Sequence, residues 1–206
     1  MSNKFFFICT CIFLTSCVNH EYQEFYKSAK INLVGTEDIP IDQDFISNRS
    51  YSFIKVRVGK SVIAIMPLLS VDNDEFEWVG SNGDRIITKF GRVIGTYGLE
   101  HNSSIIERGK ILSYENIDNS SFLTRLEDPS AIFELSTSYS RDISSIYLDK
   151  LYSAYKLRED FSSNSSFRWE GVNYFWFDVN SGLPLKTHHH THPFLPSLNI
   201  EFYYKF

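Results

Sequence analysis

The sequence has few of the residues that most often carry chemistry. Its three cysteines, Cys9, Cys11 and Cys17, all fall within the first seventeen of 206 residues, so the rest of the chain offers no thiol for a disulfide, a metal site or a nucleophile. No run of Lys and Arg occurs and the formal net charge is −5, which argues against a nucleic-acid partner. The chain also lacks a Gly-x-Ser-x-Gly motif and a phosphate-binding glycine loop, so we expect no cofactor and no such hydrolase site.

The longest apolar run is too short to span a membrane. Phe5 to Leu14 is an apolar segment of ten residues, whereas a spanning helix needs about 20. With Lys4 before it, the run is typical of an export signal. Its end, Leu14-Thr15-Ser16-Cys17, resembles a bacterial lipobox, although an ordinary secretory signal that contains a cysteine is the alternative. We therefore predict that residues 1–16 are a lipoprotein signal peptide and that Cys17 is lipidated.

The residue after the cysteine bears on localisation. In the usual enterobacterial sorting rule, an aspartate at this position retains a lipoprotein in the inner membrane, and Val18 is not an aspartate. We predict attachment to the outer membrane, on its periplasmic face. A bacterial lipoprotein carries three acyl chains, and each buried CH₂ contributes about 0.8 kcal/mol to membrane binding, so the anchor would hold the protein firmly on the bilayer.

What the chain has in abundance is apolar and aromatic residues, at 43% and 16%. This composition excludes a disordered chain and suits a single domain over residues 17–206. His20 to Val34 has its aromatic residues at helical spacing and predicts an amphipathic helix. From Tyr51 onward the apolar period becomes strand-like.

Strands are predicted over 51–58, 61–69, 75–79, 85–90, 92–97, 102–107, 131–139, 166–170, 173–179, 185–190 and 198–205. The apolar run over 61–69 suggests a central strand buried on both faces, with Pro67 ending it or marking an edge. Residues 143–156 fit a helix or a strand, and we favour the strand. Asn82-Gly83 predicts a hairpin turn. The fold class is mostly β, an antiparallel sandwich or half-barrel sheet with an N-terminal amphipathic helix.

Two blocks of the sequence resemble the YjbF/GfcB lipoproteins, whose genes lie beside those for exopolysaccharide and group 4 capsule. The first block has a Trp before an Asn-Gly hairpin and then a Gly-Arg pair, over residues 77–84, 87–94 and 96–99. The second is the aromatic segment Asn173 to Asp178 with Ser181-Gly182 after it. The resemblance covers most of the mature chain but is poor over residues 101–165. It implies a lipoprotein that serves polysaccharide export.

Three residues of these blocks are candidate glycan or partner contacts: Trp78, Arg92 and Trp176. We expect both tryptophans to be core anchors on neighbouring strands. Arg92 is expected to pair with Asp84 or Asp178, or else to face a ligand. Aromatic side chains could stack on sugars if exposed, although core packing is the favoured interpretation; the candidates are Trp169, Tyr174, Trp176, Tyr203 and Tyr204.

The segment after residue 187 contains four histidines in five positions. On a strand, His188, His190 and His192 would point the same way, and three imidazoles on one face can bind Zn²⁺ or Cu²⁺. No Asp, Glu or Cys lies nearby in sequence to complete such a site. We favour a polar strand end that runs into the loop at Pro193, and assign no metal.

The function predicted from these features is an outer-membrane lipoprotein that assists export or assembly of an extracellular or capsular polysaccharide and is not an enzyme. Its expected partners are the outer membrane, polysaccharide export proteins and the polysaccharide itself. One alternative is a periplasmic carrier that holds a lipid or lipid-linked glycan in an apolar hollow. Another is a periplasmic glycan-modifying enzyme with two carboxylates across a cleft.

Overall fold

The computed structural model describes residues 36–205, apart from 62, 108–110, 112–117 and 166. The expected N-terminal helix over residues 20–34 and the lipobox lie outside the described residues. Residues 38–59 and 63–206 form one compact unit. Of the second unit, which holds the rest of the chain, the structure describes only residues 36, 37, 60 and 61.

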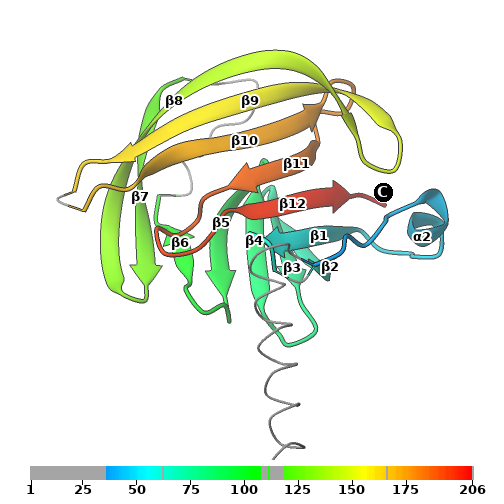
Figure 1. The fold of residues 1–206 in the computed structure, drawn as a ribbon, viewed down its shortest axis with the longest axis horizontal. Coiled ribbons are helices and arrows are strands. Elements are labelled where there is room, and N and C mark those ends of the chain that lie inside the picture. The colour runs from blue at the N-terminus through cyan, green and yellow to red at the C-terminus, as the bar shows by residue number, and fades with distance from the viewer. Residues whose placement is uncertain (1–35, 62, 108–110, 112–117, 166, 206) are drawn as a thin grey trace, which may run out of the picture. The chain divides into compact units, whose positions relative to one another are not determined.

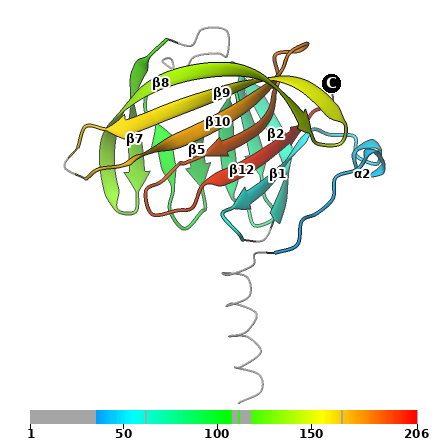
Figure 2. The ribbon, with the colours of Figure 1, turned by 45° about the horizontal axis from the view of Figure 1, so that its top comes forward.

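In the described part of the chain, twelve antiparallel strands form one closed barrel (Figures 1 and 2). They are β1 Phe53–Val58, β2 Ile63–Asp72, β3 Glu75–Val79, β4 Arg85–Lys89, β5 Arg92–Tyr97, β6 Ser103–Ile105, β7 Ser120–Glu127, β8 Ser130–Tyr147, β9 Leu151–Ser163, β10 Glu170–Asp178, β11 Pro184–His189 and β12 Leu198–Tyr203. Each strand pairs with the next along the chain, and β1 closes the barrel by pairing with β12.

The closed barrel corrects the expected sandwich or half-barrel. The closing register runs from Phe53 opposite Tyr203 to Val58 opposite Leu198. Closure gives the first and last strands a partner on both sides, which removes the two exposed edges that an open sheet would leave. A mostly β, antiparallel fold is confirmed.

The barrel interior is filled by apolar side chains in clusters along its length. One cluster surrounds Trp78 and includes Ile54, Met66 and Phe202. Another contains Phe122, Phe133, Leu135, Phe161 and Trp169, with further residues from β5 to β9. Because successive strand residues point to opposite faces, this interior takes every second side chain of each strand and leaves the alternate ones on the outer face.

The barrel wall is one sheet thick, which explains why the prediction of a strand buried on both faces over residues 61–69 is wrong. In β2, Met66 lies opposite Ile54 and is buried in the interior, whereas Leu69 and Val71 are exposed, so the strand is not buried on both faces along its length. Pro67 neither ends this strand nor lies at a sheet edge. It pairs with Phe53 of β1, whereas pairing with β3 begins at Leu68, and the proline therefore interrupts no hydrogen bond to β3.

Two local predictions are also settled. The strand interpretation of residues 143–156 is confirmed as the ends of β8 and β9 with the turn between them. The strand expected over 166–170 is wrong, because β10 begins only at Glu170. Ser163 Oγ and Ser165 Oγ both donate to the Phe167 carbonyl, and Ser163 Oγ accepts from the Trp169 amide, so these hydroxyls stabilise a turn.

The outside of β1 and β12 is covered by the segment around the short helix α2, Gln43–Ser47. Phe45 and Ile41 pack there with Phe53 and Tyr203, and Leu148 from the β8–β9 turn joins them. The described residues contain no helix of the length and hydropathy needed to cross a membrane.

Candidate functional site

A buried ion pair crosses the barrel interior. Arg92 of β5 donates through Nη1 to Glu159 Oε1 of β9 at 3.1 Å, and its Nη2 contacts Oε2. Asn173 of β10 donates to Glu159 Oε1 at 2.7 Å, and the Tyr139 hydroxyl accepts from Arg92 at 3.4 Å. The four residues form the interior polar cluster, and its carboxylate and guanidinium satisfy one another away from water.

The position of Arg92 corrects the expected pairing with Asp84 or Asp178. Asp178 instead accepts hydrogen bonds from Ser181 in the turn after β10. The residue before the arginine, Gly91, has φ +74, and a Cβ there would lie 2.9 Å from Pro184, so only glycine fits this turn. It brings Arg92 into β5 with its side chain directed inward.

Arg92 is enclosed by aromatic rings as well as by its ion pair. Its guanidinium carbon lies 5.1 Å from the ring centroid of Phe122 and 5.0 Å from that of Phe175, within cation–π range. Burial lowers the pKa of Arg92 from its usual value. A guanidinium so enclosed is a structural group, and the alternative that it faces an external ligand is wrong.

His189 of β11 lies beside this cluster and is also buried. Burial lowers the pKa of His189 well below its usual value, and the positive charge of Arg92 lowers it further. The folded barrel therefore holds a neutral imidazole at pH values where an unfolded chain, whose histidines titrate near 6.5, takes up a proton.

This difference predicts that the free energy of unfolding decreases as the pH is lowered. The contribution of His189 is fully present above about pH 6.5, and is lost at up to about 1.4 kcal/mol per pH unit as the pH falls below it. Urea unfolding from pH 7.5 to 5.0 should show this slope, and His189→Gln should make it shallower. Equal slopes in the two proteins would contradict the assignment.

The interior beside the polar cluster leaves little room for a ligand. The void lined by the interior polar cluster, His189 and their apolar neighbours measures about 20 Å³, which is enough for about one water molecule. A lipid or a lipid-linked glycan does not fit there. Among the described residues, this part of the interior is therefore not an apolar hollow of the size that a carrier of such molecules would need.

The two tryptophans of the sequence blocks lie on opposite faces of the wall. Trp78 of β3 is fully buried inside, and its Nε1 donates to Thr88 Oγ1 at 2.9 Å. Trp176 of β10 alternates with the buried Phe175 and Phe177 and is half-buried on the outer face. The core assignment is confirmed for Trp78 and wrong for Trp176, and β3 and β10 are not neighbours.

Trp176 belongs to an outer surface that we call the aromatic strip, formed by Lys156, Tyr174, Trp176 and His188. The ring centroids of Tyr174 and Trp176 lie 6.0 Å apart, and that of His188 lies 6.3 Å from Tyr174. Lys156 Nζ lies 4.6 Å from the Tyr174 centroid and 5.4 Å from the Trp176 centroid. The strip thus combines apolar ring faces with a cation that has no carboxylate partner among the described residues.

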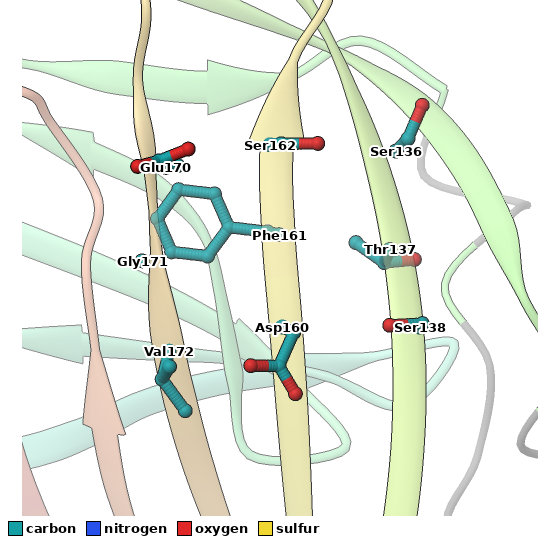
Figure 3. A pocket seen from close by; sticks show the side chains of 9 residues that line it. All are labelled: Ser136, Thr137, Ser138, Asp160, Phe161, Ser162, Glu170, Gly171 and Val172. Atoms are coloured by element: carbon teal, nitrogen blue, oxygen red, sulfur yellow. The ribbon is translucent and has the colours of Figure 1, made fainter.

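The strip continues into a groove across β8, β9 and β10, shown in Figure 3. The groove measures about 480 Å³. Its polar lining residues are Ser136, Thr137, Ser138, Asp160, Ser162 and Glu170. Ser138, Asp160 and Val172 lie opposite one another in the register. Asp160 is two positions from Arg158 along β9, and Val172 is two positions from Tyr174 along β10. Because side chains two positions apart on a strand share a face, the groove and the strip lie on the same outer face.

The carboxylates of this groove are paired. Arg158 donates to both oxygens of Asp160, at 2.9 and 2.7 Å, and these bonds hold the pKa of Asp160 below its usual value. Glu170 accepts from Arg168 Nε at 2.7 Å. A glycosidase requires one of two carboxyls to be protonated as a general acid, whereas each of these two carboxylates contacts an arginine.

The structure separates the three histidines proposed as a metal group. His188 and His190 are neighbours, with centroids 5.4 Å apart, but β11 ends at His189 and the strand alternation ends with it. His192 is buried and its ring stacks on His101 at 4.9 Å. Among the described residues no group of three or more His, Cys, Asp or Glu side chains is placed to hold a metal ion.

Of the other aromatic candidates, only Tyr174 lies in the strip. Trp169 packs edge-to-face against Phe133 and Phe161 in the core. Tyr203 stacks on Phe53 beneath the α2 segment, and Tyr204 packs against the cluster around Trp78. These three are structural, as core packing predicts.

Comparisons with known proteins place these features in context. Residues 26–202 match the model of a family described as group 4 capsule polysaccharide lipoprotein GfcB, YjbF. The solved structure of the hypothetical lipoprotein YmcC from Escherichia coli K12 is similar, with a TM-score of 0.68 and 14% identity over 88% of this chain and 97% of that one. A putative lipoprotein from Parabacteroides distasonis has a TM-score of 0.37 and 10% identity, over 75% of this chain and 94% of that one. No curated protein matches.

Proposed function

The chain belongs to the family of group 4 capsule polysaccharide lipoproteins GfcB and YjbF, and on this basis we propose that it assists export or assembly of an extracellular or capsular polysaccharide. It acts as a non-enzymatic lipoprotein, anchored through Cys17 on the periplasmic face of the outer membrane, beside other export proteins. The family match over residues 26–202 supports the polysaccharide role. The lipobox-like Leu14–Cys17 segment supports the anchor.

We further propose that the aromatic strip and the adjoining groove bind the polysaccharide. The carrying observation is the outward position of Tyr174 and Trp176, neighbouring rings on an exposed wall with Lys156 beside them. Ring faces pack against the C–H faces of sugars, while serine hydroxyls donate to and accept from sugar hydroxyls and carboxylates accept hydrogen bonds from them. An open groove, unlike an enclosed pocket, lets a long chain pass along the barrel.

The small size of the void beside the interior polar cluster favours this surface over the carrier alternative, because about 20 Å³ holds no lipid. The paired carboxylates of Asp160 and Glu170 favour binding over hydrolysis. Both observations support a protein that contacts the polysaccharide from outside the barrel.

Removing the rings should weaken polysaccharide binding. We expect Tyr174→Ala and Trp176→Ala each to raise the Kd by about two- to tenfold, since an aromatic contact contributes roughly 0.5–1.5 kcal/mol. The measurement is calorimetric titration of the detergent-solubilised lipoprotein with the polysaccharide purified from the same cells. Trp176→Phe should retain most of the affinity, because it keeps a ring at that position.

The matched control is Tyr97→Ala, which removes an exposed tyrosine from β5, outside the strip. It should bind the polysaccharide as the unmodified protein does. If the Tyr174→Ala/Trp176→Ala double variant keeps its thermal unfolding midpoint and its full affinity, the strip is not the binding surface.

A further inference from the structure

Each ring of the aromatic strip has a basic residue directly opposite it on both neighbouring strands. The register of the sheet aligns Lys156, Trp176 and Lys186 in one row, and Arg158, Tyr174 and His188 in the next. Directly opposite residues share a face of the sheet, so both rows lie on the outer face of the wall. The two rings are therefore bordered by basic groups on either side.

Two of these basic groups are already neutralised by carboxylates. Arg158 donates to both oxygens of Asp160, at 2.9 and 2.7 Å. Lys186 Nζ donates to Glu201 Oε1 at 3.2 Å. Lys156 differs from both, because within the described part of the chain its ammonium group contacts two rings and no carboxylate.

The direction of the Lys156 side chain is informative, because a carboxylate lies on its other side. Asp142 of β8 is directly opposite Lys156 in the register, yet no ion pair joins these two described residues. The ammonium nitrogen instead lies 4.6 Å from the Tyr174 centroid and 5.4 Å from the Trp176 centroid, within cation–π range. The positive charge is thus held at the ring surface rather than at the carboxylate.

This charge is opposite in sign to that of the whole protein, whose formal net charge is −5. In the two rows, Arg158 and Lys186 are balanced by Asp160 and Glu201, which leaves the charge of Lys156 uncompensated. A positive site on a negative protein attracts an anionic polymer to that site and repels it elsewhere. Charge complementarity of this kind selects the partner and fixes how it lies.

The class of sugar that the strip takes follows from this charge, and rests on the polysaccharide role proposed for the strip. We propose that the polysaccharide is acidic, and that a carboxylate on one of its sugars forms an ion pair with Lys156. The sugar that carries this carboxylate packs its C–H face on Tyr174 or Trp176. Each bound sugar of this kind contributes one ring contact and one ion pair.

A carboxylate fits this site better than a phosphate does. It carries a single negative charge, which one ammonium group neutralises, whereas a phosphate monoester carries nearly two. The second charge would face Asp160 and Glu170, which line the adjoining groove. Arginine forks are the side chains best suited to phosphate, and Arg158 is held by both oxygens of Asp160.

Removing the charge from the polysaccharide tests its class. The probe is the polysaccharide purified from the same cells, titrated calorimetrically into the detergent-solubilised lipoprotein before and after its carboxyl groups are reduced with carbodiimide and borohydride. Reduction should raise the Kd by about two- to fivefold, the range of a solvent-exposed ion pair. The difference should shrink at high ionic strength, and treatment with alkaline phosphatase, which removes phosphate monoesters, should leave the Kd unchanged.

Removing the charge from the protein tests the residue. Lys156→Gln should raise the Kd for the untreated polysaccharide by about the same two- to fivefold, but should leave the Kd for the carboxyl-reduced polysaccharide unchanged, because each change removes the same ion pair. Lys156→Arg keeps the charge and should keep the affinity. The matched control is Lys150→Gln in the β8–β9 turn, where Nζ lies 5.1 Å from the Tyr152 centroid outside the strip, and it should bind as the unmodified protein does.

The outcomes separate this inference from the polysaccharide role itself. Equal affinity for the untreated and the carboxyl-reduced polysaccharide, or a Lys156→Gln variant that weakens both alike, would overturn the acidic class and leave the polysaccharide role standing. A polysaccharide without carboxyl groups, or one whose affinity falls on phosphatase treatment, would overturn it as well. If neither form of the polysaccharide binds the unmodified protein, the polysaccharide role of the strip fails, and the acidic class fails with it.

Discussion

Replacing Glu159 with Gln is expected to destabilise the barrel by about 3–5 kcal/mol, the usual cost of removing one partner of a buried ion pair. Glu159 is fully buried, and its carboxylate holds both Arg92 and Asn173. Glutamine retains an oxygen for Asn173 but leaves the arginine charge without compensation. Urea unfolding should show the loss as a lower midpoint at unchanged slope, and the melting temperature should fall by roughly 6–20 °C.

A double-variant cycle separates the ion pair from simple packing. Arg92→Met alone should be similarly damaging, because it leaves the Glu159 carboxylate buried without its cation. The double variant Arg92→Met/Glu159→Gln removes both charges and should be more stable than either single variant, since a buried pair replaced as a whole costs little. If the losses of unfolding free energy in the two single variants simply add up in the double variant, the ion pair does not stabilise the interior.

Local features of the fold could be predicted because they depend on short stretches of sequence. The Asn82-Gly83 turn lies between β3 and β4 with Gly83 at φ +85, as a tight hairpin requires. Trp78 is in the core because it lies on the inward face of β3. Sequence alternation and turn residues determine such elements independently of the rest of the chain.

Barrel closure could not be predicted, because it depends on contacts between the two ends of the domain. Whether β1 meets β12 is decided by the twist and length of all the strands between them, and a sandwich built from the same alternating strands has the same local pattern. The pairing of Arg92 with Glu159, 67 residues apart, has the same cause. No local spacing indicates which of 25 acidic residues an inward arginine will meet.

The alternation of apolar residues along β9 and β10 contains a signal that identifies the orientation of two site residues, Glu159 and Trp176. Glu159 lies between Leu157 and Phe161 at a spacing of two, which predicts an inward carboxylate that must be paired. By the same rule, Trp176 lies between Phe175 and Phe177 and belongs on the opposite face from them. Giving weight to the size of the tryptophan rather than to its position produced the wrong prediction of a core residue.

Replacing Cys17 with Ser is expected to move the protein from the membrane fraction to the soluble or unprocessed fraction of the cell. The serine oxygen does not form the thioether that carries the diacylglycerol, so the three acyl chains are lost. At about 0.8 kcal/mol per buried CH₂, these chains supply nearly all of the membrane affinity that we assign to the anchor. Fractionation with immunoblotting, together with mass spectrometry of the N-terminal peptide, measures the change.

The signal sequence provides its own matched controls for this result. Cys9→Ser and Cys11→Ser change the same atom in the same segment, but lie in the predicted signal peptide, so both proteins should remain on the membrane. Val18→Asp should keep the acyl chains and move the protein from the outer to the inner membrane on a sucrose gradient. If the Cys17→Ser protein still sediments with membranes as a cleaved product, the attachment lies in another part of the chain and the lipobox assignment is wrong.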